Sequence, residues 1–133
     1  MGRPSRTRWR KALPSDHPLA RFEAAWSGIL DSFDEYRPLW TAMFEALAQV
    51  AHSPDLQRFL ADAAQHGRQR MAAGRHGEGV PADAERTRAR GAFHQALLIG
   101  VMAQRLMDPA RSPTGHDLGD ALRAIVAEVH AAK

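Results

Sequence analysis

The sequence predicts an all-α fold, and three observations support this. Beyond residue 14, apolar side chains recur at intervals of three and four residues, which is the period of an amphipathic helix. Prolines and glycines stand at the borders of these apolar segments, where they start or stop helices. No segment reads as a strand, an internal repeat or a low-complexity tract. We therefore expect one helical domain over residues 15–133, built from five helices.

The basic charge of the chain is concentrated in residues 1–14. This stretch holds five arginines and lysines and no acid, whereas the remainder has 13 basic against 15 acidic residues. Pro4 and Pro14 interrupt it, so we expect a disordered arm. It is either a phosphate-contacting arm, with Trp9 available to stack on a base, or a solvated tail. The rest of the chain shows no electrostatic sign of a nucleic-acid surface.

The composition is typical of a globular protein, with 44% hydrophobic and 25% charged residues. There is no cysteine, which excludes disulfides and thiolate metal sites and suits a reducing compartment. The first residues are basic but no apolar segment follows them, so they do not form a signal peptide. We expect a cytoplasmic protein with no membrane partner.

The first helix is expected to start near Ser15 or Asp16, with Pro18 in its first turn, where the missing N–H is harmless. Gly28 lies inside this helix at a cost of ~1 kcal/mol relative to alanine. The apolar stripe of this helix comprises Leu19, Phe22, Trp26, Ile29, Leu30 and Phe33.

Pro38 is expected to open the second helix, which runs to about His52. Ser53 then caps a third helix, with Pro54 at its first position and Asp55 facing the positive end of the helix dipole. The stripe of the second helix is Leu39, Trp40, Met43, Phe44, Leu47 and Val50, and the buried stripe of the third is Leu56, Phe59, Leu60, Ala63 and Met71.

The third helix ends near Gly74, and the segment 74–81 is the one glycine-rich loop. It lacks the GxxxxGK[ST] pattern, and no strand precedes it, so we interpret it as a plain linker rather than a phosphate cradle.

The longest helix is expected from about Asp83 to Met107, where Asp108-Pro109 stops it. Thr114 or Gly115 caps the last helix. The stripe of that helix comprises Leu118, Ala121, Leu122, Ile125 and Val129.

The segment 90–109 is apolar nearly all the way round the helix, whereas a surface helix shows one stripe about 100° wide. Gln95, Gln104 and Arg105 interrupt it, so it is too short for a membrane span. We therefore expect a second copy of the protein to cover part of it, although packing within the monomer is the alternative. The expected dimer interface comprises Phe93, Ala96, Gly100, Ala103, Met107, Leu118, Leu122, Ile125 and Val129.

The large side chains of the first three helices form either a solid core or the lining of an apolar ligand pocket. His94 is the polar residue expected to orient a ligand, as a buried neutral imidazole. The expected pocket comprises Phe22, Trp26, Met43, Phe44, Phe59, His94 and Leu98.

The seven histidines do not indicate a metal site. None stands in HExxH, and neither His66 nor His76 has an acid or a histidine at ligand spacing. No serine stands in a nucleophile elbow. We expect no catalytic residue, no metal, no cofactor and no enzyme activity.

Several segments together resemble the tetracycline-repressor (TetR) family of transcription regulators. Residues 96–109 (ALLIGVMAQRLMDP) and 117–126 (DLGDALRAIV) resemble the last two helices of these proteins. Residues 37–47 (RPLWTAMFEAL) and 53–63 (SPDLQRFLADA) resemble the family's sixth and seventh helices. The likeness covers residues 18–132, the ligand-binding and dimerisation half.

The resemblance implies a five-helix domain that dimerises through its last two helices, which form a four-helix interface with the partner. It also implies a small, usually apolar effector that shifts an equilibrium between DNA-binding and released states. The family's DNA reader is a helix-turn-helix of about 50 residues ahead of this region, and this chain has the basic stretch in that place. DNA binding is therefore not carried over, and we expect a fragment, a mis-started gene product, or a regulator that pairs without a reader.

Three functions stay open. The first is the effector-binding, dimerising regulatory domain of a TetR-like regulator lacking its helix-turn-helix. The second is a structural helical dimerisation module with a solid core and no ligand. The third is direct nucleic-acid binding through residues 1–14.

Overall fold

The computed structural model describes residues 17–73 and 84–133, and over these residues the chain is helical, without a strand. The all-α prediction is confirmed. The predicted basic arm, the expected helix start at Ser15 or Asp16, and the loop 74–81 lie outside the described residues. The elements are α1 (Pro18–Asp31), α2 (Phe33–Gln49), the 3₁₀ turn η1 (Val50–His52), α3 (Pro54–Ala73), α4 (Ala84–Met107) and α5 (Gly115–Ala131).

The helices form two compact units. The first contains α1, the start of α2 and α5, and the second contains the rest of α2, η1, α3 and α4. The boundaries fall between Glu35 and Tyr36, inside α2, and between Ser112 and Pro113.

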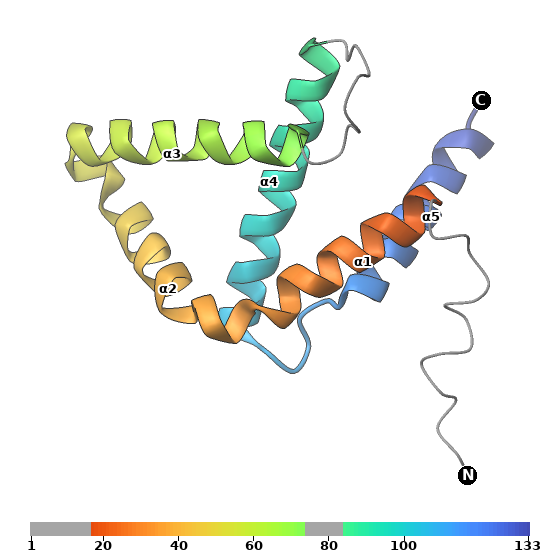
Figure 1. The fold of residues 1–133 in the computed structure, drawn as a ribbon, viewed down its shortest axis with the longest axis horizontal. Helices are drawn as coiled ribbons and strands as arrows, with labels where there is room; N and C mark the ends of the chain where they lie inside the picture. Colours follow the sequence, from red (N-terminus) through yellow and green to blue (C-terminus); the bar gives the residue numbers. More distant parts are fainter. Residues whose placement is uncertain (1–16, 74–83) are drawn as a thin grey trace. The chain divides into compact units, whose positions relative to one another are not determined.

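In the first unit, α1 and α5 lie side by side (Figure 1). Two glycines of α5 allow the close approach. A Cβ atom on Gly115 would lie 2.9 Å from the carbonyl oxygen of Glu23 and 2.8 Å from the backbone nitrogen of Ser27. A Cβ atom on Gly119 would overlap the Glu23 carboxylate. Larger residues at these positions would push the two helices apart.

Local capping residues mark the helix starts of this unit, although α1 begins at Pro18, slightly later than the start expected near Ser15 or Asp16. His17 caps α1, because its Nδ1 accepts the N–H of Leu19 at 3.2 Å, and Pro18 takes the first helical position. Thr114 caps α5 in a capping box: its Oγ1 accepts the Asp117 N–H at 3.1 Å, and the Asp117 carboxylate accepts the Thr114 N–H at 2.9 Å. The sequence left Thr114 or Gly115 as the cap, and the structure shows that it is Thr114.

The expectation that Pro38 opens the second helix is wrong. α1 ends at Asp31, the backbone N–H of Ser32 donates to Gly28 at 3.2 Å, and α2 begins at Phe33 with Pro38 inside it. A proline removes one helical hydrogen bond and crowds the carbonyl four residues earlier. Here acidic residues in the first turn favour the earlier start, because they face the positive end of the helix dipole.

In the second unit, the start of α3 and the end of α4 follow the prediction. Ser53 Oγ accepts the Leu56 N–H at 3.3 Å, which caps α3. α4 ends at Met107, the Asp108 N–H still donates to the Gln104 carbonyl at 2.8 Å, and Pro109 follows. Within residues 17–73 and 84–133, no helix is long and apolar enough to cross a membrane.

The expected buried stripe of α3 is wrong for Phe59, which is 68% exposed, and for Ala63, which is also exposed. The face of α3 that meets α4 contains Ala64, Arg68 and Ala72. At about 100° per residue, Phe59 lies roughly 140–180° around the helix from that face. Phe59 does belong to an apolar stripe at helical spacing, but α3 packs on α4 through the opposite side, where Ala64, Ala72 and the backbone of Arg68 lie.

Candidate functional site

The closest helix contact of the second unit joins the C-terminal half of α3 to the N-terminal half of α4 (Figure 1). A Cβ atom on Gly91 would lie 2.5 Å from the Arg68 carbonyl oxygen and 3.3 Å from the Ala72 Cβ atom. Only glycine allows this approach, because the nearest atoms belong to the backbone of α3.

A side-chain hydrogen bond fixes the register of the same contact. Gln95 lies one turn after Gly91, and its Nε2 donates to the Ala64 carbonyl oxygen at 2.8 Å. The same Nε2 lies 2.8 Å from the place where a Cβ atom on Gly67 would stand. The amide therefore fills the space that the glycine leaves.

Two adjoining clefts lie beside this contact. The first, of about 430 Å³, is walled by Ala72 and Ala84. The second, of about 400 Å³, extends along α4 to Ile99. Arg68 and Arg88 border both clefts.

Both clefts have the size of a small-molecule site, but only the first is mainly apolar, whereas the second is lined about equally by polar and apolar groups. Ligand pockets span about 300–1,000 Å³ and combine apolar walls with a few polar groups that orient the ligand. The Arg68 guanidinium donates to Gln65 Oε1 at 3.0 Å, and both residues line both clefts. Two guanidinium groups beside small apolar residues suit a molecule with an apolar body and an acidic group.

The seven predicted pocket residues are divided between the two units. Phe22 and Trp26 are buried in the first unit, with ring centroids 6.2 Å apart. In the second unit His94 is buried and Phe59 is exposed, while the other three are partly exposed: Met43, Phe44 and Leu98. None of the seven lines the two clefts described above.

Trp26 has the feature of this group that is most relevant to ligand binding. It is 0% exposed, and its Nε1–H has no hydrogen-bond partner among the described residues. Buried N–H groups are paired in the great majority of cases, because an unpaired one loses its bond to water. A ligand oxygen or a water molecule would satisfy this donor.

The nine predicted interface residues, five on α4 in the second unit and four on α5 in the first, are all exposed or partly exposed. Met107 is 76% exposed, and nothing lies within 4 Å of the position that a Cβ atom on Gly100 would take. His94, by contrast, is buried, as expected for a residue on another face of α4. The remaining members are Phe93, Ala96 and Ala103 on α4 and Leu118, Leu122, Ile125 and Val129 on α5. The described chain therefore leaves these side chains uncovered.

Sequence reasoning missed the residues that form the α3–α4 clefts. Arg68 and Arg88 were not among the expected site residues, and Gln95 was noted only as a polar interruption of the apolar segment 90–109. A signal was present in Gly67 and Gly91, which stand inside predicted helices where glycine is unfavourable by about 1 kcal/mol. Such a glycine indicates close packing, although nothing in the sequence names its partner helix.

A family model described as "Tetracyclin repressor-like, C-terminal domain" matches residues 17–132. The chain belongs to this family. The comparison with curated proteins and with solved structures found no match. The family assignment confirms the resemblance seen in residues 96–109 and 117–126, and it agrees with the all-helical fold of this TetR-like C-terminal domain.

Proposed function

We propose that this chain is the effector-binding and dimerising regulatory domain of a TetR-like transcription regulator. The exposure of the long helix α4 carries the proposal. Phe93 and Met107 are exposed, and the surface at Gly100 between them is open. A partner helix would pack closely at a small residue and cover the large ones beside it.

The last helix presents a second uncovered stripe. Ile125, Val126 and Val129 are exposed along α5, and Leu118 and Leu122 are partly exposed. Burying one such side chain stabilises an assembly by about 1.5–3 kcal/mol before the costs of association. A homodimer through α4 and α5, as in the family, gives both stripes a partner.

Two features support a small-molecule effector. The first α3–α4 cleft offers mainly apolar walls, and Arg68 and Arg88 border both clefts. The buried indole N–H of Trp26 offers one hydrogen bond to a ligand. An effector acts if it binds one state of the regulator more tightly than the other, which is the requirement for shifting the equilibrium.

Sedimentation equilibrium of the purified chain tests the pairing. The wild type is expected to dimerise at micromolar concentration, and Met107→Glu and Val129→Glu to weaken the dimer by about 2 kcal/mol or more, roughly thirtyfold in Kd, because each buries an unpaired charge. Leu39→Glu is the matched control: Leu39 is 66% exposed on α2 and lies outside the proposed interface. A monomeric wild type, or equal weakening by the control, would reject the proposal.

A thermal-shift screen with apolar and amphipathic acids tests the effector. A ligand present at 100 times its Kd stabilises the protein by about 2.7 kcal/mol. Arg88→Ala reports binding in the α3–α4 clefts, and Trp26→Phe, which removes the indole N–H, reports binding at Trp26. A dimer that no compound stabilises would favour the structural module without a ligand.

A further inference from the structure

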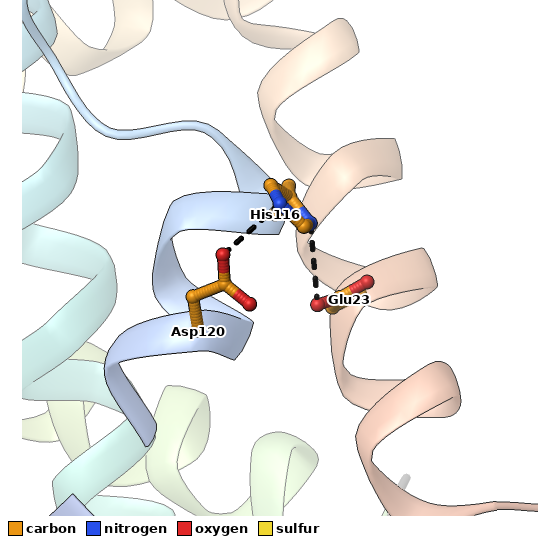
Figure 2. Close-up of side chains that lie close together, drawn as sticks. All are labelled: Glu23, His116 and Asp120. Carbon is orange, nitrogen blue, oxygen red and sulfur yellow. Dashed lines mark ion pairs between the residues drawn. The ribbon is translucent and has the colours of Figure 1, made fainter. Parts of the chain in front are cut away.

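Three side chains of the first unit lie close together where α1 packs on α5. Glu23 comes from α1, and His116 and Asp120 come from α5, one turn apart and therefore on the same face. Figure 2 shows the imidazole of His116 between the two carboxylates. Its Nδ1 lies 3.6 Å from Glu23 Oε1, and its Nε2 lies 3.0 Å from Asp120 Oδ2.

The carboxylate of Glu23 is the unusual member of this cluster. Glu23 is 8% exposed, and its Oε1 has no hydrogen-bond partner among the described residues. The 3.6 Å separation from His116 is too long for a hydrogen bond. A buried carboxylate oxygen normally accepts a hydrogen bond or binds a cation.

The fold leaves room for this carboxylate. A Cβ atom on Gly119 would overlap the Glu23 side chain, so the absence of a side chain at that position lets the carboxylate lie against α5. His116 and Asp120 flank the glycine in sequence and remain about half exposed. The cluster therefore has a buried oxygen at its base and is open to solvent on its outer side.

We propose that Glu23, His116 and Asp120 form a binding site for a divalent transition-metal cation of the Zn²⁺ type. Two ligand atoms held at about 2.1 Å from one tetrahedral ion lie roughly 3.4 Å apart. The observed separation between Glu23 Oε1 and His116 Nδ1 is 3.6 Å, close to this value. These two atoms bind the ion directly, and water completes its coordination on the exposed side.

Asp120 orients the imidazole. Its Oδ2 lies at hydrogen-bond distance from His116 Nε2, so it accepts the Nε2–H and leaves Nδ1 as the metal ligand. Its other carboxylate oxygen accepts from Arg123 Nη1 at 2.9 Å, which holds the carboxylate in place. This carboxylate–histidine–metal arrangement is the usual one around protein-bound zinc.

The ligand atoms select the class of cation. Imidazole nitrogen with carboxylate oxygen suits Zn²⁺, Co²⁺ and Ni²⁺, whereas Mg²⁺ and Ca²⁺ prefer oxygen ligands alone. The competing interpretation is that a protonated His116 bridges the two carboxylates and needs no metal. That interpretation predicts no difference between Zn²⁺ and Mg²⁺.

Calorimetric titration of the full chain with Zn²⁺, and with Mg²⁺ for comparison, tests the site. One equivalent of Zn²⁺ is expected to bind, and His116→Asn to abolish this event. Glu23→Gln is expected to weaken it at least tenfold, and Asp120→Asn by about 10–100-fold, the usual effect of losing an orienting carboxylate. His130→Ala is the matched control, because His130 is an exposed histidine in the last turn of the same helix; it should leave the affinity unchanged.

Histidine side-chain ¹⁵N NMR on the wild-type chain provides a readout that does not depend on how the variants fold. Zn²⁺ is expected to shift Nδ1 of His116 and to leave Nε2 protonated. The proposal is overturned if Zn²⁺ leaves the His116 nitrogens unchanged, if it binds through Nε2, or if His130→Ala lowers the affinity as much as Glu23→Gln.

Discussion

Replacing Gly91 by alanine is expected to destabilise the second unit, because the added methyl group meets the backbone of α3. The new Cβ atom would lie 2.5 Å from the Arg68 carbonyl oxygen, and so must be displaced by at least about 0.9 Å to reach an ordinary contact. Such overpacking costs about 1–3 kcal/mol. The higher helix propensity of alanine offsets about 1 kcal/mol of this.

Gly28→Ala separates the two contributions, since nothing lies within 4 Å of its added methyl group. Both variants gain the same propensity, so the difference between them measures the steric contribution, about 2 kcal/mol. At roughly 3–6 °C per kcal/mol for a domain of this size, Gly91→Ala should melt about 6–12 °C below Gly28→Ala by circular dichroism. Equal melting temperatures would show that α3 and α4 do not approach as closely as described.

Further predictions concern single contacts. Thr114→Ala should lower the free energy of unfolding by about 1 kcal/mol in urea, and no change would contradict the capping box. The hydrogen bond from the Thr114 backbone N–H, and to a smaller extent that from its hydroxyl, hold the pKa of Asp117 below its usual 3.8. The stabilisation from this carboxylate is therefore present above pH 3.8 and is lost as the pH falls through the lowered pKa. A carboxyl NMR titration of Asp117 with a midpoint at or above 3.8 would contradict this prediction. Phe59→Ser should change the free energy of unfolding by less than about 0.5 kcal/mol, because Phe59 is exposed. A large decrease in this free energy, measured by guanidinium unfolding, would mean that the side chain is covered. Gln95→Ala should lower the free energy of unfolding by about 1 kcal/mol, because it removes the hydrogen bond to the Ala64 carbonyl oxygen. An unchanged free energy would show that this hydrogen bond does not stabilise the second unit.

Local chemistry made the helix boundaries predictable. Ser53 was expected as a cap and Asp108-Pro109 as the stop of α4, and the structure confirms both; of the two caps proposed for α5, Thr114 and Gly115, it shows Thr114. Pro38 was misplaced because a proline usually marks the first turn of a helix, whereas here it lies inside α2 and the break at Ser32 decides where that helix begins.

Tertiary contacts were harder to predict, since a helical wheel shows which side chains are apolar but not which face another helix uses. Phe59 belonged to an apolar stripe, yet α3 packs on α4 through Ala64 and Arg68. The cluster of Glu23 and His116 joins residues from opposite ends of the chain, and no short motif connects them. The exposure of α4 was predictable because its apolar residues surround the helix.

Gly100 has a consequence for how such proteins diversify. Among the described residues nothing lies within 4 Å of the position of its Cβ atom, so packing within that part of the chain sets no steric limit there; in the proposed dimer the partner's surface would set it. In the proposed dimer, changes at this one position would alter which subunits pair while leaving the fold of each subunit intact. Related regulators in one cell could in this way avoid forming mixed assemblies, and an engineer could use the same position to make pairs of subunits that ignore each other.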